Sequence, residues 1–409
     1  MKVLHLCMSD TVGGAARAAL RIHNSQINAG IDSHLLVIEK NSAGYNVVNV
    51  SNRIRIRIRI INLLKKYILK SFNLNDNVSR SLNFFPSGIV NLIKDIGPDL
   101  INIHWIGGEI ISIRELSNIK KPIIWTMHDM WAFCATEHYE LESNFEAYTD
   151  GLKKYKNIDS FIYNYKNKYI KKMSLITVSP SHWLRSCADK SEILSNVGNY
   201  VIQNPINHDV YFPINKDLAR KSIGLEGNKK YILFGAMSSL SDPRKGNEFL
   251  LSALEIIFNE NDTENLELLV FGASSGNLKE TTGITTHYFG TLQDDISLRL
   301  LYNSADIFVA PSLQDNLPNT IVESLACGTP CVAFNIGGMS DLINKPYLGV
   351  LVDKVEGRSL ANSIMKSLST DFDCKIIHNH SKSIRDEIII GNEYYDLYTR
   401  TIERKLVGC

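Results

Sequence analysis

The chain has 409 residues, of which 44% are hydrophobic and 21% are charged, and its formal net charge is +1. These values are typical of a globular protein and exclude an intrinsically disordered or fibrous chain. Because domains of roughly 100 to 200 residues are usual, the length indicates two domains, which we expect to face each other across a cleft.

The two halves of the chain differ in charge. Residues 1–205 contain 25 Lys and Arg against 17 Asp and Glu, whereas the remaining residues contain 19 against 26. A basic first half favours contact with an anionic partner. Because no nucleic-acid-binding motif is present, we expect a lipid surface or a phosphorylated acceptor and no nucleic acid.

The N-terminus predicts a strand and not a targeting signal. Its apolar run ends at Ser9 and Asp10 and is too short for the apolar region of a signal peptide. No apolar run approaches the roughly 18 residues that a membrane-spanning helix needs, so we expect a cytoplasmic protein. The seven cysteines are scattered and form no CxxC pair, which predicts reduced thiols.

The first lobe alternates strands and helices. A strand at 2–8, a turn at Gly13 and Gly14 and a helix at 15–28 begin the chain. Further buried strands are predicted at 33–38, 100–104, 123–127, 175–178 and 200–203. This alternation predicts a doubly wound α/β domain, with a parallel sheet covered by helices on both faces.

The second lobe repeats this pattern after a linker at 204–213 that contains two prolines. Its strands are predicted at 231–235, 266–271, 286–289, 306–310, 331–334 and 349–352. We therefore predict an N-terminal Rossmann-like domain at 1–205 and a second one at 206–389, with a final helix at 390–409 that returns to the first. Because ligands bind beyond the carboxyl ends of parallel strands, the loops after the strands are the candidate sites.

The segment at 311–328 contains the strongest functional signal. A buried strand at 306–310 precedes a loop and a helix that starts near Asn319. The N-terminus of a helix has N–H groups without helical partners and a positive dipole end, so it favours phosphate. Asp315 lies before this helix and Glu323 lies one turn inside it. Two carboxylates there suit the vicinal hydroxyls of a ribose or a hexose.

This segment reads Pro-Ser-x-x-Asp-Asn-Leu-Pro-Asn-Thr-Ile-Val-Glu-Ser-Leu-Ala-Cys-Gly-Thr-Pro, which resembles the nucleotide-sugar motif of glycosyltransferase family 4. The resemblance implies that Glu323 binds the ribose and that Asp315, where the family usually has Glu, contacts the donor hexose. For Asp315 the alternative is a helix cap. The resemblance also implies diphosphate contacts from Ser312, Leu317, Asn319 and Thr320.

Two cations follow the predicted strand at 231–235. Arg244 and Lys245 lie at the start of the next helix, where they suit a diphosphate. The resemblance implies that Lys245 binds the phosphates, and that an Arg commonly stands where this chain has Ala236. We infer that Arg244 supplies that charge instead. The alternative is a solvated pair of cations.

Glycines and a histidine mark strand ends in the first lobe. The resemblance implies that the Gly13 and Gly14 loop faces the donor diphosphate, with a plain tight turn as the alternative. It also implies that His128, which follows the strand at 123–127, contacts the donor sugar. We expect Asp129 to orient this imidazole.

Two alternatives stay open for the histidines. His128 is either a ligand of the donor or a histidine whose hydrogen bonds are satisfied inside the protein. A metal site formed by His128, Glu137 and His138 is the second alternative. We assign His138, together with Trp105, Gly107 and Gly108, to the acceptor side, against the alternative of a packed Trp and a turn.

The segment at 52–70 alternates Arg and Ile before its pattern becomes helical, so both strand and helix stay open. As a helix, its arginines are expected to spread too widely for a clean stripe. Its seven cations lie between apolar residues and favour an anionic membrane surface, against the alternative of a solvated basic edge. The Lys- and Tyr-rich segment at 153–172 adds to the basic surface of this lobe.

The Asp371-Phe372-Asp373 triplet matches the DxD motif of metal-dependent glycosyltransferases. It lies away from every predicted strand end, so we interpret it as a loop. Because family 4 enzymes generally act without a bound metal, we expect no metal and no other cofactor beside the nucleotide-sugar substrate.

The resemblance implies a GT-B fold and transfer of a hexose or N-acetylhexosamine with retention of configuration. It suggests a UDP-sugar donor and a lipid-linked saccharide acceptor, as in bacterial O-antigen or capsule synthesis at the inner face of the membrane. Lys245, Arg244 and the helix end at Asn319 would stabilise the departing diphosphate, while His128 and Asp315 position the sugar. A nucleotide-sugar epimerase of the same fold and a non-catalytic scaffold of a polysaccharide assembly complex are the alternative functions.

Overall fold

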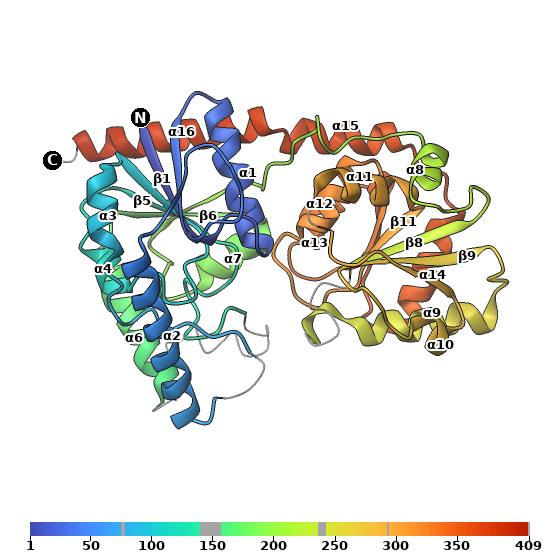
Figure 1. Ribbon diagram of the computed structural model, residues 1–409, viewed down its shortest axis with the longest axis horizontal. Coiled ribbons are helices and arrows are strands. Elements are labelled where there is room, and N and C mark those ends of the chain that lie inside the picture. Colours follow the sequence, from blue (N-terminus) through green and yellow to red (C-terminus); the bar gives the residue numbers. More distant parts are fainter. Residues whose placement is uncertain (75–77, 140–156, 236–242, 293, 408–409) are drawn as a thin grey trace. The chain divides into compact units, whose positions relative to one another are not determined.

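Two parallel sheets organise the chain (Figure 1). The computed structural model describes residues 1–74, 78–139, 157–235, 243–292 and 294–407. Contacts divide the chain into unit 1, which comprises Met1–Pro205 and Glu387–Cys409, and unit 2, which comprises Ile206–Asp386. The prediction of two doubly wound α/β domains is confirmed.

Unit 1 has a seven-stranded sheet in the order β3-β2-β1-β4-β5-β6-β7, in which all neighbouring strands are parallel. Its elements are β1 (Lys2–Ser9), α1 (Gly14–Asn28), β2 (Asp32–Glu39), β3 (Val47–Asn49), α2 (Asn52–Ser71), α3 (Ile89–Ile96), β4 (Leu100–Ile103), α4 (Ile113–Ser117), β5 (Ile123–Thr126), α6 (Ile158–Ile170), β6 (Leu175–Ser179), α7 (His182–Lys190), β7 (Gly198–Val201) and α16 (Glu387–Val407).

Helices cover both faces of this sheet because alternate strand residues point to opposite sides. On β1, Val3 packs in a core with Ile22 of α1 and Tyr398 of α16. Its neighbour Leu4 packs in the larger core with residues of α3, α4, α6 and α7, such as Ile93. The last helix, α16, therefore covers part of the sheet to which the first strand, β1, belongs.

Unit 2 has a six-stranded parallel sheet in the order β10-β9-β8-β11-β12-β13. Its elements are α8 (Lys216–Ser222), β8 (Lys230–Gly235), a 3-10 turn (Pro243–Lys245), α9 (Asn247–Glu260), β9 (Leu266–Phe271), α10 (Leu278–Thr282), β10 (Thr285–Tyr288), α11 (Asp295–Ser304), β11 (Ile307–Ala310), α12 (Asn319–Ala326), β12 (Cys331–Phe334), α13 (Met339–Leu342), a second 3-10 turn (Pro346–Leu348), β13 (Gly349–Val352), α14 (Gly357–Ser369) and α15 (Cys374–Arg385).

The second sheet also separates two cores. One core joins alternate strand residues such as Phe308 to α11, α12 and α15, and the other joins residues such as Val309 to α9 and α14. Residues 371–373 precede α15, and the Asp373 carboxylate accepts hydrogen bonds from the backbone N–H groups of Lys375 and Ile376. The last residue of the Asp371-Phe372-Asp373 triplet therefore caps the N-terminus of α15.

Most predicted boundaries lie within one residue of the observed ones, and a few differ by two or three residues. The second unit ends at 386 and not at 389, because α16 starts at Glu387 and not at 390. Strand β7 occupies 198–201 and not 200–203, because Ile176 of β6 pairs with Gly198. The helix predicted to start near Asn319 occupies Asn319–Ala326, and Gly328 follows it with a φ of +78°. Strand β3 was not predicted, because it has only three residues.

Gly391 allows α16 to dock closely on α1. A β-carbon at this position would clash with the backbone carbonyl oxygen of Ser25. We expect Gly391→Val to lower the free energy of unfolding of unit 1 by about 1 to 3 kcal/mol, as overpacked sites usually do. All four tryptophans lie in unit 1, so their fluorescence during denaturant unfolding measures this effect.

The matched control is Asn392→Val, one residue further along α16, where the side chain is exposed. We expect this variant to unfold within about 0.5 kcal/mol of the wild type. Equal destabilisation by the two substitutions would contradict the close docking of the two helices at Gly391.

Candidate functional site

The candidate donor site of unit 2 lies where the strand order reverses. Strands β8 and β11 are neighbours in the sheet although two other strands separate them in sequence. Loops after such strands diverge to opposite faces and leave room for a ligand. The loop after β8 leads to Arg244 and Lys245, and the loop after β11 contains Asp315. Ala236, the position that the resemblance assigns to an Arg, lies outside the described residues.

The structure brings Lys245 and Asp315 together. The ammonium of Lys245 donates a hydrogen bond to Oδ2 of Asp315 at 2.8 Å. The side chain of Lys245 is 35% exposed and that of Asp315 is 16% exposed. An ammonium has three donors, so Lys245 keeps the capacity to bind an anion while it holds the carboxylate. Asp315 therefore orients the cation that the sequence predicts as a phosphate ligand.

Two glycines hold the backbone of these loops in place. Gly246 has a φ of +63°, and a β-carbon there would clash with the carbonyl oxygen of Pro311. Gly337 has a φ of +60°, and a β-carbon there would clash with the carbonyl oxygen of Asp315, which also accepts a hydrogen bond from the Gly338 N–H at 3.1 Å. Gly337 and Gly338 were not among the predicted site residues, although a glycine pair after a buried strand is the signal that identifies them.

The carboxylate of Glu323 is buried. The residue lies on α12 and is only 2% exposed, and its Oε2 accepts a hydrogen bond from the hydroxyl of Tyr302 at 3.0 Å. Burial and the neighbouring Glu323 charge raise the pKa of Tyr302 well above its ordinary value, so the hydroxyl stays a donor. Tyr302 lies on α11, and no sequence signal links it to the site.

The remaining predicted donor residues line the same loop and helix end. Ser312 is buried in the loop, while Asn319 and Thr320 are half-buried and form the first residues of α12. Leu317 packs in the core with Phe308, so its side chain is not available to a ligand. A contact from Leu317 would therefore involve its backbone.

In unit 1, the predicted glycine loop ends at the start of α1. Gly13 precedes the helix with a φ of +92°, which side chains rarely adopt, and Gly14 is the first helical residue. Strands β1 and β4 are the neighbours between which the strand order of this sheet reverses. The loop thus occupies in unit 1 the topological position that the Lys245 loop occupies in unit 2.

His128 ends a row of three histidines. Its Nε2 lies 3.0 Å from Nδ1 of His104, whose Nε2 lies 2.8 Å from Nδ1 of His5. The next partner is Gln26, whose Oε1 lies 2.8 Å from Nε2 of His5. Burial lowers the pKa of His5 to about 3 and that of His128 to about 4, and it also lowers the pKa of His104. The three rings are therefore neutral at pH 7.

The prediction that Asp129 orients His128 is wrong. The Oδ2 atom of Asp129 lies 2.6 Å from Nδ1 of His138 and accepts from Nε1 of Trp105 at 2.9 Å. Although burial opposes it, the charge and hydrogen bond of His138 lower the pKa of Asp129. The carboxylate turns toward His138 because that imidazole can donate to it, whereas Nε2 of His128 is engaged by His104.

The other residues assigned to the acceptor side surround this carboxylate. His138 is 5% exposed, and its Nε2 lies 2.8 Å from the hydroxyl of Ser81. Gly107 is buried against the ring of Trp105, and Gly108 has a φ of +74°. Trp105 and His138 thus form a packed network, while Trp105 and Gly108 keep part of their surface exposed.

The alternative metal site is not formed. Within the described part of the chain, no three His, Cys, Asp or Glu side chains gather in an arrangement that could hold a metal ion. Glu137 instead forms an ion pair with Arg80 at 2.6 Å, and His138 bonds to Asp129 and Ser81. Glu137 and His138, two of the three residues of the alternative metal site, therefore belong to separate hydrogen-bond networks.

The segment at 52–70 is helical throughout, as part of α2. Ile58 and Ile61 face the core, and the helix is tied to the loop after β4 because Nδ2 of Asn62 donates to the Gly108 carbonyl at 2.7 Å. On the exposed side, large apolar side chains follow one another at helical spacing, each 46% to 75% exposed: Ile56, Ile60, Leu63, Leu64 and Tyr67.

Cations flank this exposed apolar stripe of α2. Arg53, Arg57, Arg59, Lys66 and Lys70 are all exposed. Among the described helices, none is both long enough and apolar enough to cross a membrane. An exposed apolar stripe between cations is the pattern of a helix that lies on a membrane surface.

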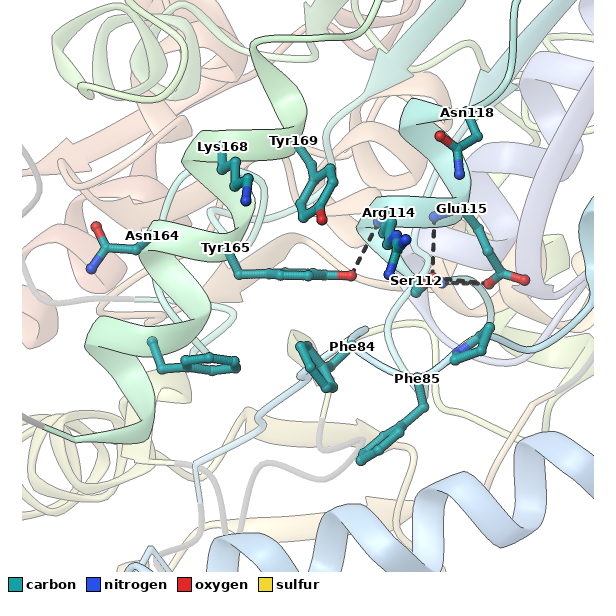
Figure 2. Close-up of a pocket in the computed structure, with 12 residues that line it drawn as sticks. Phe84, Phe85, Ser112, Arg114, Glu115, Asn118, Asn164, Tyr165, Lys168 and Tyr169 are labelled. Carbon is teal, nitrogen blue, oxygen red and sulfur yellow. Dashed lines mark hydrogen bonds between the residues drawn. The ribbon is translucent and has the colours of Figure 1, made fainter.

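An aromatic pocket of about 750 Å³ lies in unit 1 between α4, α6 and the segment at 84–86 (Figure 2). Tyr165 reaches across it from α6, and its hydroxyl accepts a hydrogen bond from the Arg114 N–H at 3.2 Å. The wall combines aromatic rings with two cations and is formed in part by Phe84, Phe85, Phe161, Tyr169, Arg114 and Lys168. No local sequence pattern predicts this pocket, because its walls come from distant segments.

The segment of unit 2 that contains the candidate donor site matches a known protein family. Residues 229–370, which include Lys245, Asp315 and Glu323, match the family described as glycosyl transferases group 1. The chain is 27% identical over 171 residues to a D-inositol 3-phosphate glycosyltransferase of Rhodococcus opacus, and this match covers 39% of the chain and 37% of the relative.

A second relative is the UDP-Gal:alpha-D-GlcNAc-diphosphoundecaprenol alpha-1,3-galactosyltransferase of Escherichia coli. It is 28% identical over 206 residues, which cover 47% of this chain and 49% of the relative. The chain thus spans about half, or less, of the length of these curated relatives.

Solved structures give the fold. The Anabaena protein HepE, solved in complex with UDP and glucose, matches with a TM-score of 0.65 and 15% sequence identity over 98% of this chain and 99% of that one. At this identity the likeness concerns the fold alone. The fold is GT-B, with two Rossmann-like domains, as the sequence analysis predicted.

The histidine row makes the stability of unit 1 depend on pH. The unfolded chain takes up protons near the ordinary histidine pKa of 6.5, whereas burial keeps His5, His104 and His128 neutral in the folded state well below it. Stability is therefore full above pH 6.5 and is lost as the pH falls toward 4. We expect a loss of about 1.4 kcal/mol per pH unit for each ring between pH 6 and 5.

Tryptophan-monitored unfolding at pH 7, 6 and 5 measures this slope. His5→Phe should have a shallower slope than the wild type, whereas the control His182→Phe, at an exposed position of α7, should keep it. A denaturation midpoint that stays constant from pH 7 to 5 would show that the histidines are not neutral in the folded protein.

Proposed function

We propose that this chain, which has the GT-B fold and matches the group 1 glycosyl transferases over residues 229–370, is a glycosyltransferase that uses a nucleotide diphosphate sugar. The observation that carries the proposal is the Lys245 and Asp315 ion pair beside the N-terminus of α12, the helix that also contains the buried Glu323. A cation and a helix N-terminus suit a diphosphate, and carboxylates suit sugar hydroxyls.

The proposed chemistry is transfer with retention of configuration. Lys245 and the N–H groups at Asn319 stabilise the charge that develops on the departing diphosphate, as positioned cations and dipoles do. Arg244 adds a second cation beside Lys245. Glu323, held by Tyr302, binds the ribose, and Asp315 and His128 position the hexose. The acceptor hydroxyl then attacks on the face from which the diphosphate leaves, without a metal cofactor.

A UDP-sugar that carries a hexose or N-acetylhexosamine is the proposed donor, and a lipid-linked saccharide is the proposed acceptor. The complex of HepE with UDP and glucose supports the donor, and the name of the Escherichia coli relative supports a diphosphate-lipid acceptor. Synthesis of O-antigen or capsule at the inner face of the cytoplasmic membrane is the corresponding role. The exposed apolar stripe of α2 supports a membrane contact, because this helix adjoins the Gly108 loop that we assign to the acceptor.

Substitution of the donor residues tests the site. We expect Lys245→Ala and Glu323→Ala to abolish sugar transfer and to weaken UDP binding at least tenfold, because a hydrogen bond to a charged group contributes about 1.5 to 3 kcal/mol. Calorimetry with UDP measures binding, and transfer from a panel of labelled nucleotide sugars to a membrane lipid extract measures activity.

The matched controls are Lys366→Ala on α14 and Glu255→Ala on α9, which remove exposed side chains of the same types from unit 2. Both controls should bind UDP like the wild type. Wild-type transfer by Lys245→Ala and Glu323→Ala would refute the site. Two other results favour the alternative functions: an epimer formed from the nucleotide sugar alone, or no nucleotide sugar bound at all.

Acidic substitutions in the exposed apolar stripe of α2 test the membrane proposal. We expect the wild type to sediment with vesicles of anionic phospholipid and less with vesicles of neutral phosphatidylcholine. Ile60→Glu combined with Leu64→Glu should lower vesicle binding more than tenfold, because burying each such side chain contributes about 1.5 to 3 kcal/mol. Ile296→Glu, at a 60% exposed position of unit 2, is the control and should bind normally. Equal sedimentation of the double variant would exclude α2 as the membrane contact.

A further inference from the structure

A row of aromatic rings lines the pocket between α4 and α6. The ring centroid of Phe84 lies 5.3 Å from that of Phe85 and 5.0 Å from that of Tyr165. Phe161 adjoins Phe84 at 5.3 Å, and Tyr169 adjoins Tyr165 at 4.9 Å. Figure 2 shows Tyr165 across the pocket, with Tyr169 on one side and the two phenylalanines, Phe84 and Phe85, on the other. The row therefore offers an extended apolar surface against which an alkyl chain can be buried.

Cations accompany these rings. Arg114 and Lys168 line the pocket from α4 and α6, and both side chains are exposed. A third cation, Lys172, lies beside the pocket: its Nζ is 5.3 Å from the ring centroid of Tyr169, and Nζ of Lys168 is 5.6 Å from the same centroid. Guanidinium and ammonium groups that gather in this way favour an anionic ligand, and phosphate above all.

Among the described residues that line the pocket, Glu115 is the only one with a carboxylate. Its Oε1 accepts a hydrogen bond from the Gly88 N–H at 3.0 Å. Its Oε2 accepts from the Ser87 N–H at 3.0 Å and from the N–H and the hydroxyl of Ser112 at 3.1 and 3.0 Å. Glu115 is thus held by the capping box of α4 and by the preceding loop. The cations around the pocket outnumber this carboxylate, so its charge balance favours an anion.

A short segment joins the pocket to the residues that we assign to the acceptor. The hydroxyl of Ser81 lies 2.8 Å from Nε2 of His138 and accepts a hydrogen bond from the Gly108 N–H at 3.3 Å. Phe84, in the pocket wall, follows Ser81 by three residues. Even a fully extended chain separates their α-carbons by about 11 Å at most. The pocket is therefore within reach of a molecule bound at the acceptor residues.

The helix with the exposed apolar stripe, α2, adjoins the same segment. Nζ of Lys65 donates a hydrogen bond to the Arg80 carbonyl at 3.3 Å, and Ile68 and Leu69 pack against the same buried cluster as Phe84. A ligand in the pocket therefore lies near the surface that we propose to contact the membrane. The pocket volume of about 750 Å³ is within the range of roughly 300 to 1,000 Å³ that is usual for small-molecule sites.

We propose that the pocket between α4 and α6 binds a phosphorylated single-chain lipid, with its alkyl chain against the aromatic row and its phosphate between Arg114 and Lys168. Binding of such a lipid follows from the chemistry of the pocket, whereas its identity as the lipid part of the sugar acceptor rests on the proposed function. A saccharide also stacks on aromatic rings, but the excess of cations over carboxylates favours a phosphate.

Calorimetry with dodecyl phosphate, below the concentration at which it forms micelles, tests the class of ligand. We expect saturable binding at one site. Inorganic phosphate, which lacks the chain, and dodecyl maltoside, which has a neutral disaccharide in place of the phosphate, should each bind at least about tenfold more weakly. Equal binding of inorganic phosphate overturns the role of the rings, and equal binding of dodecyl maltoside overturns the role of the cations. The absence of saturable binding of dodecyl phosphate overturns the whole proposal.

Substitutions in the pocket wall locate the bound lipid. Arg114→Ala combined with Lys168→Ala should weaken dodecyl phosphate binding about tenfold, because charged hydrogen bonds to the phosphate are lost. Phe161→Ala, which removes a 51% exposed ring, should weaken it by a similar factor through loss of apolar contact. All three side chains are exposed, so the fold should tolerate their removal. Wild-type affinity in both variants overturns the assignment to this pocket.

The controls remove similar side chains elsewhere. Lys94→Ala combined with Lys190→Ala removes two exposed cations from α3 and α7 of unit 1, and Phe258→Ala removes a 44% exposed ring from unit 2. Both should bind dodecyl phosphate like the wild type. Ile60→Glu combined with Leu64→Glu, in the stripe of α2, should also keep this affinity. A loss of binding in that variant would show that dodecyl phosphate binds to α2 and not in the pocket.

Transfer kinetics separate this proposal from the proposed function. Arg114→Ala combined with Lys168→Ala should raise the KM for a membrane lipid acceptor about tenfold, in line with the loss of phosphate contacts. The affinity for UDP should stay unchanged, because UDP is assigned to unit 2. If dodecyl phosphate binds as expected but the wild type transfers no sugar, the proposed function fails and the lipid site stands. A wild-type KM in a variant that no longer binds dodecyl phosphate overturns the link between the pocket and the acceptor.

Discussion

The strand order of the two sheets is the constraint on which both candidate sites depend. In each unit the first strand lies inside the sheet, so the chain winds outward in one direction and then in the other. The chain therefore continues from the neighbouring strands β8 and β11 to α9 and α12, which pack on opposite faces of the sheet. Lys245 and Asp315 meet at this point, and Gly246 permits the close approach of the two loops because it has no side chain. The same reversal between β1 and β4 places the Gly13 loop beside the end of β4.

The candidate sites of the two units differ in the charge of their side chains. Unit 2 keeps charged groups at its site: Lys245 is paired with Asp315, and Glu323 is buried but bonded to Tyr302, which compensates for the loss of water. In unit 1 the three histidines of the row are neutral, because burial disfavours the charged form of each ring and lowers its pKa. A cationic site suits a diphosphate, and a neutral one suits the hydroxyl groups of a sugar.

The predictions that succeeded relied on local patterns. Alternation of buried strands and helices predicted both sheets, and the buried strand at 306–310 followed by a loop predicted a helix start near Asn319 that the structure contains. The failures concern contacts between distant segments. Adjacency in sequence suggested that Asp129 holds His128, but the carboxylate meets His138, nine residues away, because the chain folds back on itself. For α2, the alternation of Arg and Ile suited strand and helix equally.

The sequence by itself determined the class of the fold, the position of the helix end that we propose as the phosphate site, and the residue types proposed to hold a nucleotide sugar, because backbone preferences and side-chain chemistry are local properties. Only the tertiary structure decided which of these groups are partners. It paired Lys245 with Asp315, placed Tyr302 on Glu323 and aligned Gln26 with three histidines, since hydrogen bonds in a folded core join residues that are up to 372 positions apart in the chain. The chemical state of the site residues, and with it the difference between a charged and a neutral site, depends on those partners.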